Sequence, residues 1–363
     1  MSFPRKRESI YSYNLIMQND KLNSILAKED LTKDEIVYLL SLSDKDDIAQ
    51  LFKHADEVRK EFCGDDVHLR GIIEFSNNCE QDCLYCGLRI SNDSLPRYRM
   101  TKEEILSTVD HIVKAKIKTI VLQSGEDSSY TKEFIADVIK SIKEKYNVAI
   151  TLSLGERSFE DYDAWRKAGA DRYLLKHETA NKRLYSAIHN KQSLDERVKH
   201  LEYLKSIGFQ AGSGNIIGLP GQTIEDIADD ILLCKKLISD MASFSPFIPS
   251  NDTPFKNVSK ADLEMTLKTM AVARIVLKDA HIPSTTALGS LVENGREKGL
   301  EIGANVVMPN YTPNPYRQNY KIYEGKICIT DDPLACTGCL RFKIEALGRN
   351  ISEEQGHTLK TNL

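Results

Sequence analysis

Three cysteines within eight residues are the most informative chemical feature of the sequence. Cys79, Cys83 and Cys86 have the spacing C-x3-C-x2-C in the segment CEQDCLYC. A structural zinc site normally closes with four ligands, and no fourth cysteine lies nearby in the sequence. Three thiolates can instead hold a 4Fe-4S cluster, which leaves one iron free for a further ligand. The spacing favours the cluster and leaves zinc as the alternative.

A second group of three cysteines lies near the end of the chain. Cys328, Cys336 and Cys339 have the spacing C-x7-C-x2-C. The basic start, MSFPRKRES, lacks the apolar core of a secretory signal, which predicts a cytoplasmic protein with reduced thiols. Clustered cysteines are then expected to bind metal rather than to form disulfides. Cys234, within the apolar run ILLCKKLI, is expected to be a core thiol.

The elements that position these cysteines are predicted to form an α/β protein with a TIM-type (β/α)8 barrel. From residue 68 a short apolar or β-branched run is followed by an amphipathic helical run, and the pattern repeats eight times. The expected strands cover residues 69–75, 119–124, 149–154, 172–177, 212–217, 242–248, 283–288 and 304–308. The expected helices cover residues 102–116, 131–146, 159–169, 193–207, 223–239, 261–280 and 294–302. Such alternation is typical of a closed parallel barrel, and an open doubly wound sheet is the alternative.

Polar residues follow the expected strands, where such barrels carry their catalytic groups. The C-terminal ends of all the strands of a (β/α)8 barrel meet at one mouth. Polar stretches occur at seven of these ends: 76–78, 123–127, 153–156, 177–179, 218–222, 285–286 and 309–311. Because CEQDCLYC directly follows the first strand, the three thiols are predicted to lie at the same mouth.

The rest of the chain divides around the barrel. We expect residues 1–19 to be disordered or a non-native start, 20–67 to be an N-terminal helical extension and 68–313 to be the barrel. Residues 314–363 are a C-terminal extension that carries the second cysteine group and ends in a mobile polar segment. The 363 residues have a net charge of −4 and no apolar run long enough to cross a bilayer. This charge gives no electrostatic case for nucleic acid or an anionic membrane as a partner.

The three-cysteine segment, with Tyr85 before its last cysteine and strand one before it, resembles the signature of the radical S-adenosylmethionine (SAM) superfamily. The resemblance implies a 4Fe-4S cluster on Cys79, Cys83 and Cys86 whose free iron binds the amino and carboxylate groups of SAM. One electron from the cluster would then break a carbon–sulfur bond and give a 5′-deoxyadenosyl radical. A closed barrel suits this chemistry because it keeps water away from the radical.

The same resemblance suggests which residues contact SAM. Ser124-Gly125-Glu126 resembles the Gly-Gly-Glu motif that grips the methionyl amine, with serine in place of the first glycine, and a solvated turn is the alternative. Glu178 suits the ribose or amine of SAM and Arg197 its carboxylate, while ordinary surface charges are the alternative. The candidates are Tyr85, Gln123, Gly125, Glu126, Ser153, Glu178, Arg197 and Ile216.

Longer segments resemble one branch of the superfamily, the HydE maturases of FeFe-hydrogenase. CLYCGLR, VLQSGED, TLSLGER, GLPGQT and ANVVMPNYTP occur in order, within a match from about residue 20 to about residue 348. The resemblance implies assembly of the hydrogenase diiron centre from a small iron–cyanide–carbonyl species that carries cysteine. It also implies other maturases as partners and a ferredoxin- or flavodoxin-type reductant. Some members carry a second 2Fe-2S or 4Fe-4S cluster, here on Cys328, Cys336 and Cys339.

An anionic substrate of this kind would need cations and hydroxyls within the barrel. The candidates are His177, Thr285, Thr286, Arg317 and Tyr323, and for each the alternative is a polar residue of the mouth without substrate contact.

Three other functions are alternatives. A biotin synthase-like enzyme is opposed by the lack of cysteines on strands four and five, and a methylornithine synthase-like enzyme leaves the second cysteine group unexplained. An iron–sulfur scaffold or carrier is the alternative of another class, and it would not cleave SAM.

Overall fold

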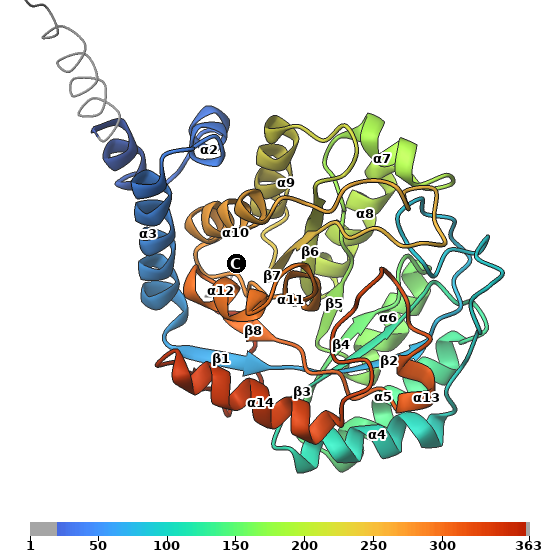
Figure 1. The fold of residues 1–363 in the computed structure, drawn as a ribbon. Helices are drawn as coiled ribbons and strands as arrows, with labels where there is room; N and C mark the ends of the chain where they lie inside the picture. Colours follow the sequence, from blue (N-terminus) through green and yellow to red (C-terminus); the bar gives the residue numbers. More distant parts are fainter. Residues whose placement is uncertain (1–19, 361–363) are drawn as a thin grey trace, which may run out of the picture.

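A ring of parallel strands surrounded by helices forms the centre of the molecule (Figure 1). The computed structural model describes residues 20–360, so the segment 1–19, expected to be disordered or non-native, lies outside the described residues. Six strands pair in parallel and in chain order: β2 (Gly71–Ser76), β3 (Thr119–Ser124), β4 (Ala149–Ser153), β5 (Arg172–Leu174), β6 (Gln210–Ile217) and β7 (Met241–Pro246). A second parallel sheet has the order β8–β1–β9, with β8 (Val306–Val307), β1 (Asp66–Leu69) and β9 (Asn350–Ile351).

Isolated parallel bridges join the two sheets into a ring. The bridges are Met241–His281, Pro283–Val306 and Ile72–Asn310. Going around the ring, strands β2 to β7 are followed by residues 281–283 and then by β8. Asn310, just after β8, bridges to Ile72 of β2 and closes the ring. This closure, with a helix between most neighbours, confirms the predicted (β/α)8 barrel and excludes the open sheet.

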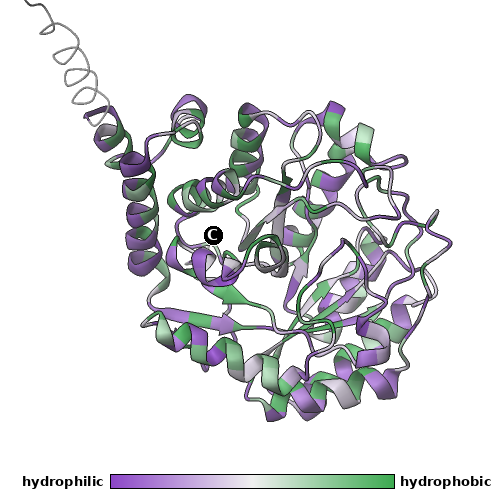
Figure 2. Ribbon diagram, in the orientation of Figure 1, coloured by the Kyte–Doolittle hydropathy of each residue, from purple (hydrophilic) through white to green (hydrophobic). Residues whose placement is uncertain are grey.

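The helices cover the outside of the ring (Figure 1). Seven were predicted, with boundaries that differ by a few residues: α4 (Lys102–Lys114), α5 (Lys132–Lys145), α6 (Phe159–Ala168), α8 (Leu194–Ser206), α9 (Ile224–Lys236), α10 (Leu263–Leu277) and α12 (Gly295–Glu301). The capping box predicted at the start of α4 is present, with Thr101 accepting from the amide of Glu104 and Glu104 accepting from that of Thr101. Figure 2 shows the alternation of apolar and polar residues along these helices. No helix within residues 20–360 is long and apolar enough to span a bilayer.

The seventh expected strand, 283–288, is wrong beyond its first residues. Residues 286–291 form the helix α11 (Thr286–Leu291), because the side chain of Thr285 accepts a hydrogen bond from the amide of Leu288 and so starts a helix. The β-branched pair of threonines predicted a strand, but here Thr285 caps the helix and Thr286 is its first residue. The short helix α7 (Lys182–Ile188) was also not predicted.

The two extensions pack on the outside of the barrel and approach each other beside β1, which pairs with β9 (Figure 1). In the N-terminal extension, residues 20–26 are helical and are followed by α2 (Lys33–Leu40) and α3 (Lys45–Cys63), which pack against α9 and α10. The C-terminal extension contains α13 (Asn314–Arg317), α14 (Pro333–Ala346) and β9.

The end of the chain was expected to be mobile, but its described part is anchored. Arg172, buried at the start of β5, donates to the carbonyl oxygens of Gln355 (2.7 Å) and Gly356 (2.6 Å). Residues 350–360 therefore cover the N-terminal end of the barrel, opposite the mouth that carries the polar strand ends.

Candidate active site

A cavity of about 360 Å³ lies at the mouth of the barrel, along the C-terminal parts of the strands. Of the residues predicted to contact SAM, the cavity wall includes Tyr85, Gln123, Glu178 and Ile216. Of those predicted to contact substrate, it includes Thr285, Thr286 and Tyr323. Cys86, the last thiol of the three-cysteine loop, also lines it. The barrel thus brings residues from positions 85 to 323 to one cavity at its mouth.

The three-cysteine loop, residues 79–86, is fastened to three separate parts of the molecule. Its backbone makes the following hydrogen bonds: Glu80 N to Glu126 O (2.9 Å), Leu84 N to Ile188 O (3.0 Å) and, just beyond the loop, Gly87 N to Ile322 O (3.0 Å). A side chain at Gly125 would collide with the carbonyl oxygen of Asn78 and with Cys79. The glycine of the Ser124-Gly125-Glu126 segment therefore allows β3 to approach the loop closely.

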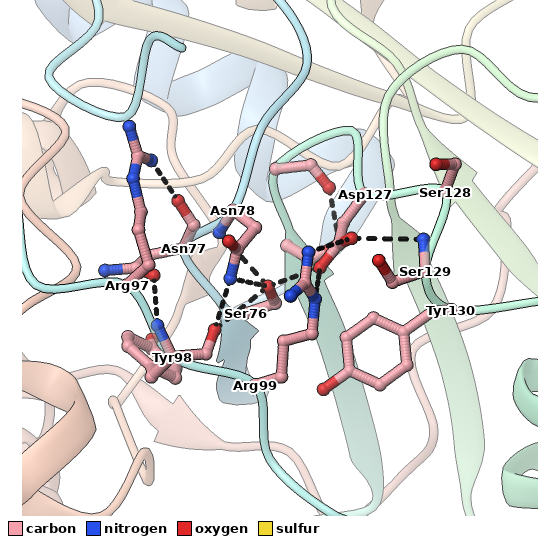
Figure 3. Close-up of polar contacts among 12 residues, drawn as sticks. Ser76, Asn77, Asn78, Arg97, Tyr98, Arg99, Asp127, Ser128, Ser129 and Tyr130 are labelled. Carbon is pink, nitrogen blue, oxygen red and sulfur yellow. Dashed lines mark hydrogen bonds and ion pairs between the residues drawn. The ribbon is translucent and has the colours of Figure 1, made fainter. Parts of the chain in front are cut away.

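A polar network fixes the base of the loop (Figure 3). The hydroxyl of Ser76, at the end of β2, donates to Asp127 (2.8 Å), and Arg99 donates to both oxygens of the same carboxylate (2.7 and 2.9 Å). Asn78 donates to the carbonyl oxygen of Tyr98 (2.8 Å). Asp127 is buried, so each of these charge-assisted bonds holds the ends of β2 and β3 in one arrangement.

The thiols of Cys79, Cys83 and Cys86 lie close enough to affect one another. Burial raises the pKa of each thiol, to about 12 for Cys86, and the negative charge of the neighbouring thiols raises the pKa values of Cys83 and Cys86 further. Mutual repulsion of this kind is what a bound iron group would relieve, with release of the protons. Within residues 20–360 no three metal-binding side chains are already gathered around one point. The ligand set therefore rests on the spacing and the place of the loop.

Glu126 and Arg197 lie beside the cavity without lining it. Glu126 accepts hydrogen bonds from Gln81 of the loop (2.6 Å), from the amide of Glu156 (3.0 Å) and from Gln192 (3.1 Å), while its burial raises its pKa. Arg197 is ion-paired with Glu156 (2.5 Å). The side chain of Arg197 is buried and that of Glu126 is half-buried, and both are engaged by partners. Glu126 is therefore not the solvated residue, and Arg197 not the surface charge, that were the alternatives.

Tyr85 and Glu178 are held in the cavity wall by specific partners. The Tyr85 hydroxyl lies 3.1 Å from Nε2 of His189, whose pKa is lowered to about 4 by burial and by the charge of Arg197. Glu178 has a left-handed backbone (φ 61°), which non-glycine residues rarely adopt, and its carboxylate lies 2.8 Å from Lys176. A backbone strained in this way at a cavity wall is typical of a functional position.

Two of the predicted substrate residues lie elsewhere. His177 is fully buried, with Nδ1 2.9 Å from the hydroxyl of Ser213, and it does not line the cavity. Arg317 donates to the carbonyl oxygens of Thr312 (2.8 Å), Cys328 (3.1 Å) and Asp331 (2.8 Å), so its guanidinium braces the C-terminal extension.

The sequence analysis missed an ion pair in the cavity wall. The ammonium of Lys326, from the C-terminal extension, lies 2.5 Å from Glu74 on β2, and Asn310 donates to the other oxygen of Glu74 (2.8 Å). The side chains of Lys326 and Glu74 are 6% and 4% exposed. A carboxylate in the apolar strand GIIEFS was a signal that could have been used, but its partner lies 252 residues away.

The second cysteine group lines a smaller cavity of about 140 Å³ at the edge of the barrel. Cys336 is buried on α14, Cys339 is exposed one turn later, and Cys328 approaches from the preceding loop. A hydrogen bond with Cys336 and the charge of Arg296 lower the pKa of Cys328 to about 6, although burial opposes the shift. An anionic sulfur beside a second thiol suits a metal ligand set.

Comparisons with known proteins agree with this site. The Radical SAM superfamily model matches residues 73–234, which contain the three-cysteine loop and strands β3 to β6. The fold resembles that of the methylornithine synthase PylB, with a TM-score of 0.79, 25% identity and coverage of 92% of this chain and 98% of that one. It also resembles the hydrogenase maturase HydG, with a TM-score of 0.78, 20% identity and coverage of 94% and 79%. The chain is a radical SAM enzyme, a class that uses a 4Fe-4S cluster and SAM.

Sequence similarity places the chain more narrowly within this class. It is 49% identical over 331 residues to the FeFe-hydrogenase maturase subunit HydE of Thermotoga maritima, which covers 91% of this chain and 95% of the relative. The identity to a 3-methylornithine synthase of Methanosarcina acetivorans is 28% over 279 residues, 76% of this chain and 79% of the relative. The chain belongs to the HydE family of FeFe-hydrogenase maturases.

Proposed function

We propose that Cys79, Cys83 and Cys86 hold the 4Fe-4S cluster at the mouth of the barrel and that SAM lies between the cluster and the cavity. The observation that supports this most strongly is the three-cysteine loop itself, whose last thiol opens onto a cavity that Tyr85, Gln123 and Glu178 also line. When bound and reduced, the cluster supplies one electron to the sulfonium of SAM, and a carbon–sulfur bond of SAM breaks.

The residues around the cavity divide the binding of SAM between them. Tyr85 and Ile216 offer apolar surface to the adenine. Gln123, Ser153 and Glu178, at the ends of β3 and β4 and beyond β5, supply polar groups for the ribose and amine. Four of these five residues line the cavity, and Ser153 is the neighbour of Gln123 in the pairing of β4 with β3.

Gly125 and Glu126 support the three-cysteine loop rather than line the cavity. Glu126 joins the three-cysteine loop to residues 156 and 192 through its carboxylate, and Gly125 lets the strand approach the loop. Arg197 orients Glu156 and donates to the carbonyl oxygen of Lys176 (2.6 Å), next to the cavity wall. We assign Glu126 and Arg197 to positioning this side of the SAM site.

We propose that the substrate is a small anionic organometallic species, an iron–cyanide–carbonyl compound that carries cysteine, as in the HydE family. Two lysines reach the cavity wall, Lys176 and Lys326, and each is paired with a glutamate. Their positive charges suit an anion, while the hydroxyls of Thr285, Thr286 and Tyr323 offer hydrogen bonds to cyanide or carboxylate groups. His177 and Arg317, which do not line the cavity, support its surroundings.

We further propose that Cys328, Cys336 and Cys339 hold a second, 2Fe-2S or 4Fe-4S cluster. The partners would be a ferredoxin- or flavodoxin-type reductant and the other hydrogenase maturases, in the reducing cytosol where such clusters persist.

The test of this function is anaerobic reconstitution with iron and sulfide, followed by dithionite and SAM. We expect 5′-deoxyadenosine to form, with a yield that rises when the organometallic substrate is added. An iron–sulfur scaffold or carrier would form none. Absence of 5′-deoxyadenosine with and without substrate would refute the proposed function.

A further inference from the structure

The second cysteine group lies within a few side chains of the substrate cavity. The two cavities share no lining residue, but two segments contribute to both: α11, through Thr286 and Gly289, and residues 326–328, through Lys326 and Cys328. Thr286, the first residue of α11, lines the substrate cavity. Cys328 lines the smaller cavity on the other side.

Arg296, on α12, bridges the two cavities directly. Its Nη2 donates to the hydroxyl of Thr286 (3.0 Å), and its Nη1 lies 4.0 Å from the sulfur of Cys328. The residue is 6% exposed, and its Nε is buried without a hydrogen-bond partner. One guanidinium therefore touches the wall of the substrate cavity and the thiol of the second cysteine group.

The charge of Arg296 points to an anion in the smaller cavity. None of the ion pairs within residues 20–360 joins it to a carboxylate, whereas Lys343, on the same cavity, is paired with Glu297. A buried charge needs negative charge nearby, and the sulfur of Cys328, 4.0 Å away, can carry it. A metal group held by the thiolates of Cys328, Cys336 and Cys339 would add negative charge at the same place.

A second connection runs through Ser290, near the end of α11. Its hydroxyl donates to the carbonyl oxygen of Thr286 (3.0 Å) and accepts from the amide of Ile327 (3.1 Å). Ile327 stands between Lys326, which reaches the substrate cavity, and Cys328, whose backbone is left-handed (φ 60°). Helix α11 is thus attached to the segment that ends at the thiol.

We propose that Arg296 is a positioning residue that couples the second cysteine group to the substrate cavity. Its guanidinium balances the charge of the metal–thiolate group and, through Thr286, fixes the wall of the substrate cavity at α11. Metal binding at the edge of the barrel thereby orders the site at its mouth. The inference rests on the proposed function, because it assigns a metal to the second cysteine group.

The first test asks whether metal binding orders the cavity wall at α11, and it measures hydrogen–deuterium exchange of residues 284–292. In the full-length wild-type protein, loading the second cysteine group with iron should slow exchange in this segment. Arg296→Met and Arg296→Lys should abolish the effect, because neither side chain can contact Thr286 and Cys328 together. Lys343→Met is the matched control, since it removes a cation of the same cavity that already has a carboxylate partner, and it should behave as the wild type.

The second test measures the charge, by redox titration of the second cluster followed by electron paramagnetic resonance. The background is Cys79→Ala/Cys83→Ala/Cys86→Ala, which isolates this cluster. Removing a nearby positive charge disfavours the reduced form, so Arg296→Met should lower the reduced-to-oxidised ratio at a fixed potential about tenfold, about 59 mV for a one-electron couple. Arg296→Lys keeps the charge and should shift the ratio less than about twofold.

The outcomes separate this inference from the proposed function. Unchanged exchange on loading, equal potentials in Arg296→Met and Lys343→Met, or no iron at the second group would each overturn the coupling. Loss of SAM cleavage in the wild type would overturn the proposed function and leave the exchange and redox results standing. Arg296→Lys keeps the question answerable if Arg296→Met does not fold.

Discussion

The two cysteine groups contain the same number of thiols in opposite surroundings. The three-cysteine loop at the mouth is tied to the barrel by backbone hydrogen bonds and by the buried network around Asp127. The second group is spread over a loop and one face of α14, and Cys339 is exposed. The first group opens onto the large cavity, and the second lies at the edge of the molecule.

This difference separates two ways in which a fold can use iron–sulfur ligands. A group fixed in a rigid frame at the mouth of a barrel can place a reactive iron against a bound molecule. A group on a helix at the surface can stabilise its surroundings or pass electrons, without contact with the reacting atoms. We therefore expect substitutions at the mouth to abolish SAM cleavage. Substitutions at the edge should instead alter stability, iron retention and the redox potential of the second cluster.

The largest effect is expected from removal of one ligand of the loop at the mouth. Cys83→Ala should reduce 5′-deoxyadenosine formation to the background of the assay, because two thiolates cannot hold the cluster with one free iron. Anaerobic assay with dithionite and SAM, with iron analysis of the same sample, measures the loss.

The matched change at the edge is Cys336→Ala. It should lower the iron content by the share of the second cluster and leave SAM cleavage within about twofold of the wild type, because this thiol does not line the substrate cavity. The comparison breaks down if Cys83→Ala still cleaves SAM or if Cys336→Ala abolishes cleavage.

The next effect concerns Lys326, where the C-terminal extension enters the mouth. Lys326→Met leaves Glu74 buried without its counter-charge, and breaking a buried pair in this way costs roughly 3–5 kcal/mol. The midpoint of urea unfolding should fall accordingly. The double variant Glu74→Gln/Lys326→Met removes both charges and should recover most of the stability.

Substrate dependence separates this structural cost from binding. The double variant should still cleave SAM, but the stimulation by the anionic substrate should weaken, because a cation has left the cavity wall. If the double variant is as unstable as Lys326→Met, the unpaired charge of Glu74 does not account for the loss of stability.

The sequence predicted the barrel because strand and helix patterns alternate with little interruption, and local periodicity is enough to define such a unit. The three-cysteine loop was predictable because its ligands are close neighbours in the sequence. The seventh strand failed because capping by Thr285 competes with the strand propensity of β-branched residues. The other predicted helices have boundaries within a few residues of those observed, because local sequence patterns determine where they begin and end.

The cavity wall was harder to predict because it depends on long-range contacts. Arg317 has the right charge for a substrate residue, but three carbonyl oxygens of the C-terminal extension engage its guanidinium. Lys326, in a segment without clear periodicity, reaches Glu74 instead. Only the packing of the extension on the barrel decides which of the two cations enters the cavity.

The pH dependence of thiol reactivity should sharpen the comparison in the metal-free protein. Burial raises the pKa of Cys86 to about 12, so its thiolate fraction should grow about tenfold per pH unit between pH 7 and 9. A hydrogen bond with Cys336 lowers the pKa of Cys328 to about 6, so its thiolate is already formed at pH 7 and should change little. Iodoacetamide labelling rates at pH 7, 8 and 9, followed by mass spectrometry, give both slopes. Because slopes are compared, unequal access does not affect the result, and equal slopes would contradict the assignment.

The smallest effect should come from the cap of the helix that carries two of the edge thiols. Asp332 accepts hydrogen bonds from the amides of Leu334 and Ala335 (3.0 Å each) at the start of α14. Asp332→Ala should cost about 1 kcal/mol, seen as an earlier fraying of α14, and should weaken iron retention at Cys336 and Cys339 severalfold under chelator challenge. Asp332→Ser keeps a capping oxygen and should retain iron as the wild type does. SAM cleavage should be unaffected in both variants, because α14 contributes no residue to the wall of the substrate cavity; loss of cleavage in Asp332→Ala alone would show that the edge group acts on the mouth more strongly than its position implies.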